Sequence, residues 1–155
     1  MKVLIEVDEN ITENEVVIKC NALNDQIQEL QKMITMTATK KQSFMAYKGE
    51  TEFYLALEDI LFFETGDNGI HVHTAADIYL VKSKLYELEF ILPGSFMRVS
   101  KSAILNTNKV YSVTRNLTAT SIVQFQNSAK QVYVSRYYIR ALKNKLEEKV
   151  GGKAL

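Results

Sequence analysis

The sequence predicts a mainly β fold of small antiparallel sheets with a few helices, preceded by an N-terminal α+β arm. From residue 43 onward, short segments rich in β-branched and aromatic residues alternate with turn residues at close spacing, a pattern typical of all-β proteins. Helical spacing of apolar residues is limited to a few short segments. A chain of 155 residues is long enough for one domain with a core, or for a domain and a small arm.

The arm is expected to span residues 1–42 and to end in the polar stretch "TMTATKKQ". "KVLIEV" and "NEVVIKC" predict two short strands, and Asn24 is expected to cap a helix. That helix would carry four apolar side chains on one face: Leu23, Ile27, Leu30 and Ile34. Two strands and one helix bury too little surface for a stable core. The arm is therefore expected to pack on the rest of the chain or on a second copy of the protein.

Residues 43–150 are expected to form the second domain, which begins with strands and tight turns. "SFMAYKG" and "TEFYLAL" predict two strands joined at Lys48–Gly49, and "LEDI" predicts a single helical turn before the strand "LFFET". "GDNG" predicts a hairpin, because Asp, Asn and Gly tolerate positive φ angles. "IHVHT" and "IYLVK" would flank a further turn at "AAD".

The remainder of this domain combines two predicted helices with further strands. "SKLYELEFIL" predicts a helix that is capped by Ser83 and stops at Pro93–Gly94. Residues 95–113 show neither a helical polar face nor clean alternation, and we expect a short, irregular segment anchored by apolar side chains. "KVYSVT", "TSIVQF" and "QVYVS" predict strands separated by turns at "RNLT" and "QNSAK". The last helix would follow Ser135 as its N-cap, with three residues on its apolar face: Ile139, Leu142 and Leu146.

The composition excludes several classes of protein. The single cysteine, Cys20, excludes an internal disulfide and a four-cysteine metal site, and it is compatible with a reducing compartment. The apolar runs are too short to span a membrane, and the N-terminus does not resemble a signal peptide. We therefore expect a cytoplasmic protein.

The sequence does not predict an enzyme or a metal protein. His71 and His73 would lie on one face of a strand, but a zinc site needs further ligands, and none follows at a suitable spacing. Three acidic residues near the first hairpin are expected to be cap or turn residues: Asp59, Glu64 and Asp67. Motifs for a serine nucleophile, a Gly-rich phosphate loop or a metalloprotease are absent from the sequence. We expect no catalytic residues, no cofactor and no small-molecule substrate.

Charge is distributed unevenly along the chain. Residues 1–65 contain 6 Lys and no Arg against 12 Asp and Glu, a net charge of −6, whereas residues 66–155 carry a net charge of +7. In the basic part, cations fall at predicted strand ends, loops or helix starts: Lys82, Lys84, Arg98, Lys101, Arg115, Arg136 and Arg140. Lys and Arg neutralise phosphates, nearby Ser and Asn fix register, and a rigidly held cation can pair with guanine. This pattern indicates a polyanionic partner such as DNA.

Two alternatives remain open for individual cations. A structural salt bridge explains Arg98 as well as a phosphate contact does. Three lysines on the last helix are expected to be solvated surface charges: Lys143, Lys145 and Lys149.

"FMRVSKSAILNTNKV" resembles the core signature of the LytTR family of bacterial DNA-binding domains. The signature positions are Phe96, Arg98, Val99, Ser100, Lys101, Ser102, Ile104, Leu105 and Asn106. "LEDILFFETGDN" resembles the first strand and loop of the family, and "VYVSRYYIRAL" resembles its closing strand and helix. The resemblance covers about residues 43–148 and implies small antiparallel sheets of the LytTR type, which recognise duplex DNA with loops rather than with a recognition helix.

The resemblance also implies site residues. The base contacts would be Asn68, with His71 as an alternative in the same loop, together with Lys101 and Arg136. We expect phosphate contacts from neighbouring polar and basic residues: Lys82, Arg98, Ser100, Ser102 and Arg115. Many members of the family carry His where this chain has Ser100, which leaves the base preference open.

The main hypothesis is therefore a sequence-specific transcriptional regulator that binds double-stranded DNA as a homodimer on paired half-sites. The chain resembles stand-alone members of the family that lack a receiver domain, because only about forty residues precede the DNA-binding part. Such members carry a small acidic arm, so the resemblance implies that residues 1–42 are a dimerisation surface or a docking site for a regulatory partner. Such members also suggest a regulatory membrane protein as a further partner. The alternative hypothesis is a β-rich protein-interaction module whose basic face binds an acidic protein.

Overall fold

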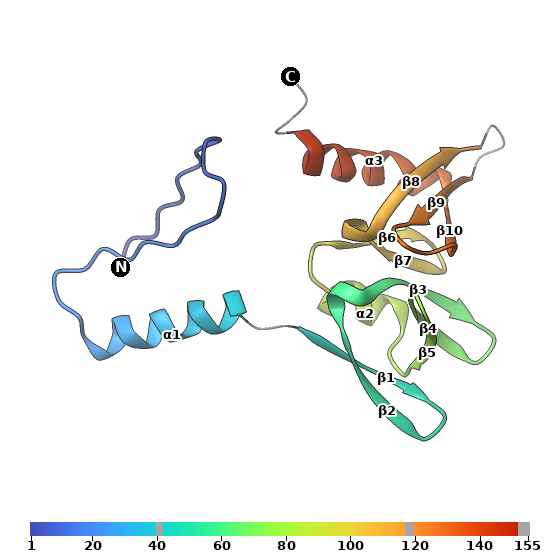
Figure 1. Ribbon diagram of the computed structural model, residues 1–155, viewed down its shortest axis with the longest axis horizontal. Helices are drawn as coiled ribbons and strands as arrows, with labels where there is room; N and C mark the ends of the chain where they lie inside the picture. The colour runs from blue at the N-terminus through green and yellow to red at the C-terminus, as the bar shows by residue number, and fades with distance from the viewer. Residues whose placement is uncertain (40–41, 117–119, 152–155) are drawn as a thin grey trace. The chain divides into compact units, whose positions relative to one another are not determined.

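The computed structural model describes residues 1–39, 42–116 and 120–151. The contacts within the chain divide it into two compact units, one up to Thr39 and one from Gln42 onward. The first unit contains helix α1 (Asp25–Thr39) (Figure 1). The Asn24 side chain accepts a hydrogen bond of 3.0 Å from the backbone N–H of Ile27, which confirms the predicted N-cap.

The two strands predicted in the first unit are wrong, because residues 1–20 are irregular. The apolar side chains of the first segment have nothing to pack against: Val3, Ile5 and Val7 are 82%, 83% and 89% exposed. An isolated two-stranded hairpin is marginally stable even when its sequence alternates correctly. The assignment of residues 1–42 as a separate functional arm remains a prediction.

The second unit is mainly β, as predicted, and all its strand pairs are antiparallel. The first sheet has the order β2-β1-β5-β4-β3-β7-β6 and contains β1 (Ser43–Lys48), β2 (Thr51–Ala56), β3 (Ile60–Gly66), β4 (Gly69–Thr74), β5 (Ile78–Val81), β6 (Phe96–Ser100) and β7 (Ala103–Asn106). The second sheet has the order β10-β9-β8 and contains β8 (Val110–Arg115), β9 (Ser121–Phe125) and β10 (Gln131–Val134). The helical elements are η1 (Leu57–Asp59), α2 (Leu85–Ile91), η2 (Thr107–Lys109) and α3 (Arg136–Val150).

The predicted turns join these strands, but the backbone φ angles of one turn differ from the prediction. The β3–β4 hairpin forms at "GDNG" with Gly66 opposite Gly69. Gly69 alone adopts a positive φ, of 131°, whereas Asp67 and Asn68 do not. Part of the predicted "RNLT" turn lies outside the described residues.

The prediction of an irregular segment at residues 95–113 is wrong. This segment forms the β6–β7 hairpin, the short helix η2 and the start of β8. All four residues of β7 are buried because β7 lies between β3 and β6. Ile104 packs into one core and Leu105 into another. A strand buried on both faces does not alternate in polarity, so its sequence gave no strand signal.

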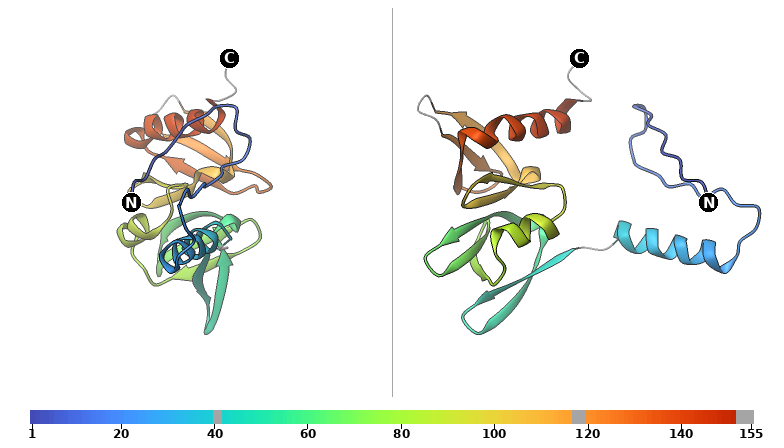
Figure 2. Two further views of the ribbon diagram at one scale, coloured as in Figure 1. Left: turned by 90° about the vertical axis from the view of Figure 1, so that its left-hand side faces the viewer. Right: turned by 180° about the vertical axis from the view of Figure 1, so that it is seen from behind.

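Strand β3 supplies side chains to both cores. Phe63 lies in the first core, on the side of the large sheet that α2 covers with Leu85 and Leu88. Phe62 lies in the second core, between the two sheets and α3, where Leu142 is buried. Figure 2 shows α2 beside the large sheet and α3 beside the small sheet. The apolar face predicted for the last helix is thereby confirmed, since Ile139 and Leu146 also pack against the second core.

The ends of these helices are fixed by specific contacts. Helix α2 starts one residue later than predicted, with Lys84 rather than Ser83 as N-cap, because the Glu87 carboxylate accepts the backbone N–H of Lys84 at 2.9 Å. Helix α3 follows Ser135, as predicted. The hydroxyl of Ser135 makes no capping hydrogen bond; its backbone N–H instead donates to the carbonyl oxygen of Val99 at 2.8 Å.

Asn106, the last residue of the signature, has a structural role. Its side chain is buried, and its amide nitrogen donates to the carbonyl oxygen of Ile60 at 2.9 Å. Its amide oxygen accepts the backbone N–H of Asn108 at 3.1 Å. These two bonds satisfy a buried polar group and fix the end of β7 to the start of β3.

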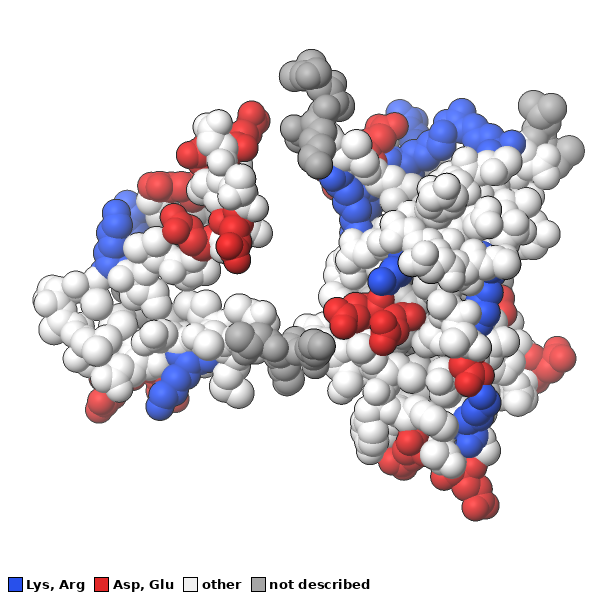
Figure 3. Space-filling model, in the orientation of Figure 1, with Lys and Arg blue, Asp and Glu red and all other residues white. Residues whose placement is uncertain are grey.

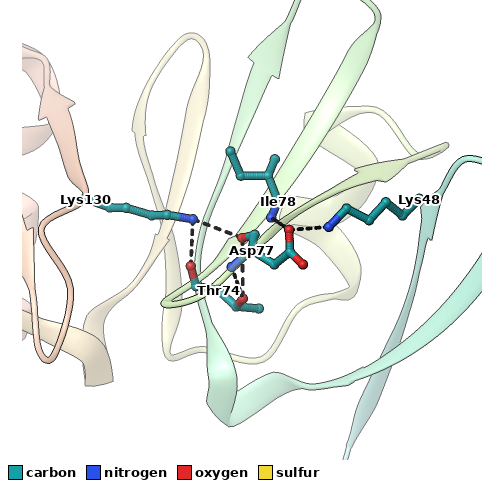
Figure 4. Close-up of polar contacts among 5 residues, drawn as sticks. All are labelled: Lys48, Thr74, Asp77, Ile78 and Lys130. Carbon is teal, nitrogen blue, oxygen red and sulfur yellow. Dashed lines mark hydrogen bonds and ion pairs between the residues drawn. The ribbon is translucent and has the colours of Figure 1, made fainter.

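Lys130 connects the two sheets at the end opposite the β3–β4 turn. Its ammonium group donates to the carbonyl oxygens of Thr74 and Asp77 at 2.8 and 3.0 Å (Figure 4). The Asp77 carboxylate pairs with Lys48 and accepts the backbone N–H of Ile78 at 3.0 Å. These interactions hold the pKa of Asp77 below its usual value. The turn between β4 and β5 is therefore fixed to a loop of the second sheet.

The stability of the second unit is expected to fall when the pH is lowered below about 6.5. His73 is buried and stacked on Phe62 with ring centroids 4.1 Å apart, and burial lowers its pKa below the usual 6.5 although Glu64, 2.8 Å away, opposes this shift. Below pH 6.5 the unfolded chain therefore binds more protons at this residue than the folded protein does, and acid favours unfolding.

This expectation is tested by denaturant unfolding at about pH 7.5 and about pH 5. The His73→Gln variant, which does not titrate at this position, should lose less stability than the wild type over the same interval. An equal loss in both proteins would contradict the assignment to His73.

Within the described residues, no helix has both the length and the apolar character needed to cross a lipid bilayer.

Candidate nucleic-acid interface

The β3–β4 and β6–β7 turns lie next to each other at one end of the large sheet. The backbone N–H of Thr65, at the end of β3, donates to the carbonyl oxygen of Ser102 at 2.8 Å. Strand β5 ends at the same place, since Val81 pairs with Ile70 at the start of β4. We call this end of the sheet, together with the adjoining end of the small sheet, the turn edge.

The small sheet reaches the turn edge through the junction of β10 and α3. The hydrogen bond from Ser135 to Val99 fixes this junction to β6, so Arg136 follows directly beside the β6–β7 turn. In the small sheet, Arg115 pairs with Ser121, which pairs with Val134, so the end of β8 lies at the same level. All eight predicted contact residues are thus at the turn edge: Asn68, Lys82, Arg98, Ser100, Lys101, Ser102, Arg115 and Arg136.

Lys101 is exposed at the tip of the β6–β7 turn. The Ser100 hydroxyl oxygen accepts the backbone N–H of Ser102 at 3.1 Å, and the two hydroxyl oxygens are 3.3 Å apart. This local bond closes the turn from inside. The Lys101 side chain therefore extends from a turn whose backbone conformation is fixed.

Arg98 is directed back into the protein beneath this turn. Its Nε donates to the carbonyl oxygen of Ser100 at 2.6 Å, and one terminal nitrogen donates to that of Lys101 at 2.5 Å. The other terminal nitrogen forms an ion pair of 3.1 Å with Glu89 of α2. The structural salt bridge that the sequence left open is present, although nothing in the sequence pointed to Glu89 as the partner.

Asn68 and His71, the two alternatives for the first loop, are joined to each other. His71 Nε2 lies 2.8 Å from the side-chain oxygen of Asn68. The ring of His71 covers Gly66 so closely that a Cβ there would lie 2.3 Å from two atoms of the ring, Cε1 and Nδ1. Gly66 therefore makes room for the imidazole that holds the Asn68 side chain.

The Gly66→Ala variant is expected to displace the His71 ring and release Asn68, because the ring is the movable partner. We expect a loss of about 1 kcal/mol in the free energy of unfolding and a change in the NMR signals of the His71 ring and the Asn68 amide. The matched control is Gly94→Ala, where a Cβ would meet Lys145 Nζ no closer than 4.0 Å. Unchanged His71 signals in Gly66→Ala would contradict this arrangement.

A groove runs along the turn edge between the β3–β4 hairpin and α2. It is lined by Thr65, Gly69, Lys82, Lys84, Arg98 and Lys101, among others. The ammonium group of Lys82 lies 4.3 Å from the centroid of the Tyr47 ring, and that of Lys84 lies 5.9 Å from that of Tyr86. Aromatic faces hold both side chains in place by cation–π attraction. Lys84 was recognised from the sequence as a cation in a suitable place but was not assigned a contact.

Two of the lysines on α3 are not simply solvated. Lys145 donates to the carbonyl oxygen of Gly94, and Lys149 donates to the side-chain oxygen of Asn108. Lys149 stays exposed, as expected of a surface charge, whereas Lys145 is partly buried because the helix packs against the loop before β6. The expectation is therefore wrong for Lys145. Figure 3 shows acidic side chains gathered on the segment before α1 and basic side chains around α3.

A metal site is not found among the residues that the structure describes, where no group of three or more His, Cys, Asp or Glu is placed to hold an ion. His73 is buried and pairs with Glu64.

Comparisons with known proteins show the family of the chain and its fold. The family model of the LytTr DNA-binding domain matches residues 50–147. Two relatives from Staphylococcus aureus, strains NCTC 8325 / PS 47 and bovine RF122 / ET3-1, are both named as uncharacterized HTH-type transcriptional regulators. Each is 26% identical to this chain, and the alignments cover 94% of the chain and 98% of each relative.

A solved LytTr DNA-binding domain from Bacillus cereus has the same fold. It superimposes with a TM-score of 0.61 at 23% identity, covering 69% of this chain and 97% of that structure. The described part of the present chain contains no helix-turn-helix, because five strands separate α2 from α3. A helix-turn-helix needs two helices joined by a short turn.

Proposed function

The chain belongs to the family of LytTR DNA-binding domains and is a DNA-binding transcription regulator; from this premise we propose that it recognises a specific duplex sequence with the side chains of its turn edge. Asn68, Lys101 and Arg136 make the base contacts in this proposal. One observation carries it: the hydrogen bonds Thr65 to Ser102 and Ser135 to Val99 link the three elements that bear these residues. Side chains fixed on one edge can enter one groove of a duplex together.

Phosphate contacts come from residues around these three. Lys82 and Arg115 are exposed cations on either side of the β6–β7 turn, and Ser100 and Ser102 offer hydroxyl groups beside it. Such contacts position the protein on the backbone without selecting sequence. Arg98 is engaged within the protein and is considered separately below.

Salt dependence and footprinting test this proposal. The logarithm of the affinity for a footprinted site should fall linearly with the logarithm of salt concentration, with a slope of about −0.9 for each phosphate neutralised. The alternative of a protein-interaction module with a basic face predicts a shallow slope and no footprint. A purified protein that protects no DNA sequence would refute specific recognition.

We propose further that the protein acts in the cytoplasm as a homodimer on paired half-sites, joined through residues 1–42, which could also dock a regulatory membrane protein. The support is the helix α1, whose side chains Ile27, Leu30 and Ile34 stay partly exposed within the first unit. A Leu30→Lys, Ile34→Lys variant should sediment as a monomer if α1 joins the copies. Retention of a dimer in this variant would contradict dimerisation through α1.

A further inference from the structure

We propose that Arg98 and Glu89 are positioning residues, which hold the β6–β7 turn so that Lys101 reaches its base, and that Arg98 does not contact phosphate. The inference rests on the proposed function of the turn edge and assigns a mechanism to part of it. Arg98 carries the positive charge that a phosphate contact needs, but its guanidinium group is bound within the protein. We call its hydrogen bonds to Ser100, Lys101 and Glu89 the clamp.

The geometry of the guanidinium group supports this role. Each of its three nitrogens donates a hydrogen bond within the protein: to Ser100 O, to Lys101 O and to the Glu89 carboxylate. A planar guanidinium holds its donors in a fixed fork, so two consecutive carbonyl groups of the turn are aligned by one rigid group. Fixing the Lys101 carbonyl group also fixes the direction in which the Lys101 side chain leaves the backbone.

The turn needs this support because its backbone is unfavourable for a tight hairpin. Two-residue hairpins prefer turns with positive φ angles, whose twist matches that of the strands. Neither Lys101 nor Ser102 has a positive φ. In addition, the pairing shifts register between Arg98 and Ser100, so β6 is bulged immediately before the turn. A bulge redirects the side chains that follow it, and the clamp selects one of the available directions.

Glu89 anchors the clamp to a rigid element. It lies on α2, whose Leu85 and Leu88 are buried in the first core. The Arg98 side chain is only 18% exposed, whereas the Glu89 side chain is 51% exposed. An ion pair with such an exposed partner adds little to folding stability, so its main effect is on orientation. An acidic side chain beside a DNA-binding edge would otherwise only repel phosphate.

The test compares operator binding by the wild type and by Arg98→Lys, Lys101→Ala and the double variant. For each protein we would measure the ratio of affinities for the operator and for operators changed at single base pairs, and the salt slope. Lys at position 98 keeps the positive charge but loses the fork. A phosphate contact would therefore survive in Arg98→Lys, whereas a clamp would not.

The clamp predicts that Arg98→Lys and Lys101→Ala lose discrimination at the same base pair, by about 5- to 100-fold. The double variant should lose no more than Lys101→Ala alone, and the salt slope of Arg98→Lys should equal that of the wild type. Discrimination at base pairs that depend on Arg136 should stay unchanged, which a general folding defect would not allow. Full discrimination in Arg98→Lys would overturn the inference.

The Glu89→Gln variant tests whether Glu89 acts on DNA binding through its charge or through the clamp. Loss of a negative charge should strengthen binding to all DNA sequences if Glu89 acts only through its charge. The clamp predicts lower discrimination at the base pair that depends on Lys101. The control is Glu50→Gln, which removes an exposed charge in the β1–β2 turn. Discrimination in Glu89→Gln that equals that of Glu50→Gln would overturn the role of Glu89.

The same experiment separates failure of this inference from failure of the proposed function. A wild-type protein without a footprint would contradict recognition by the turn edge itself. A normal footprint and a normal effect of Lys101→Ala, combined with full discrimination in Arg98→Lys, would contradict the clamp alone.

Discussion

Replacing both Lys101 and Arg136 by alanine is expected to weaken specific DNA binding by about 2 to 6 kcal/mol, since each base contact contributes about 1 to 3 kcal/mol and separate positions add approximately. The two residues lie on different elements, the β6–β7 turn and the start of α3, and meet at the turn edge through the bond from Ser135 to Val99. Each single variant should lose about half of this amount and should relax base preference at its own position.

The effect is measured by titrating a footprinted operator and a scrambled duplex with each variant at a fixed salt concentration. The control removes the same charge elsewhere: Lys2→Ala with Lys19→Ala changes two exposed residues of the first unit outside α1. This control should bind with nearly wild-type preference. An unchanged base preference in the Lys101→Ala, Arg136→Ala protein, with folding intact, would refute the assignment of base contacts.

The Phe63→Ala variant is expected to lose about 3 to 5 kcal/mol of the free energy of unfolding. Phe63 is fully buried in the first core, and its ring centroid lies 5.2 Å from that of Phe44 and 5.9 Å from that of Phe96. Removal of the ring therefore leaves a cavity beneath the central strands of the large sheet. Such a loss is a large share of the stability of a typical domain, about 5 to 15 kcal/mol.

Chemical denaturation followed by circular dichroism gives this value directly. Phe90→Ala serves as the matched control, because Phe90 is 90% exposed on α2 and its removal should change stability by no more than about 0.5 kcal/mol. Similar losses in the two variants would mean that Phe63 does not occupy the core as described.

The sequence correctly predicted the turns and helix ends whose formation depends on a few neighbouring residues. "GDNG" predicted a hairpin, and Asn24 predicted the start of a helix, since both signals come from backbone preferences of a few residues. The β6–β7 hairpin was missed because β7 is buried on both faces, a property that depends on β3 and β6 as neighbours. The strands predicted at residues 1–20 do not form because alternation alone supplies no partner strand.

The sequence also predicted the candidate site only in part. The signature pointed to Lys101 and Arg136, but it did not separate residues that face outward from residues that support them. Asn106 belongs to the signature and is buried in a structural role, and Arg98 is bound to Glu89, which lies nine residues earlier on α2. Such partners follow from packing in three dimensions, and no spacing rule along the chain identifies them.

The most direct test of recognition by the turn edge is an NMR titration of the isotope-labelled protein with an operator duplex. We predict that the backbone and side-chain signals of Asn68, Lys101 and Arg136 shift together and saturate at the same DNA concentration. Signals from the opposite end of the large sheet, at Lys48 and Asp77, should stay in place. Shifts concentrated at Lys48 and Asp77, with the turn edge unaffected, would contradict the account.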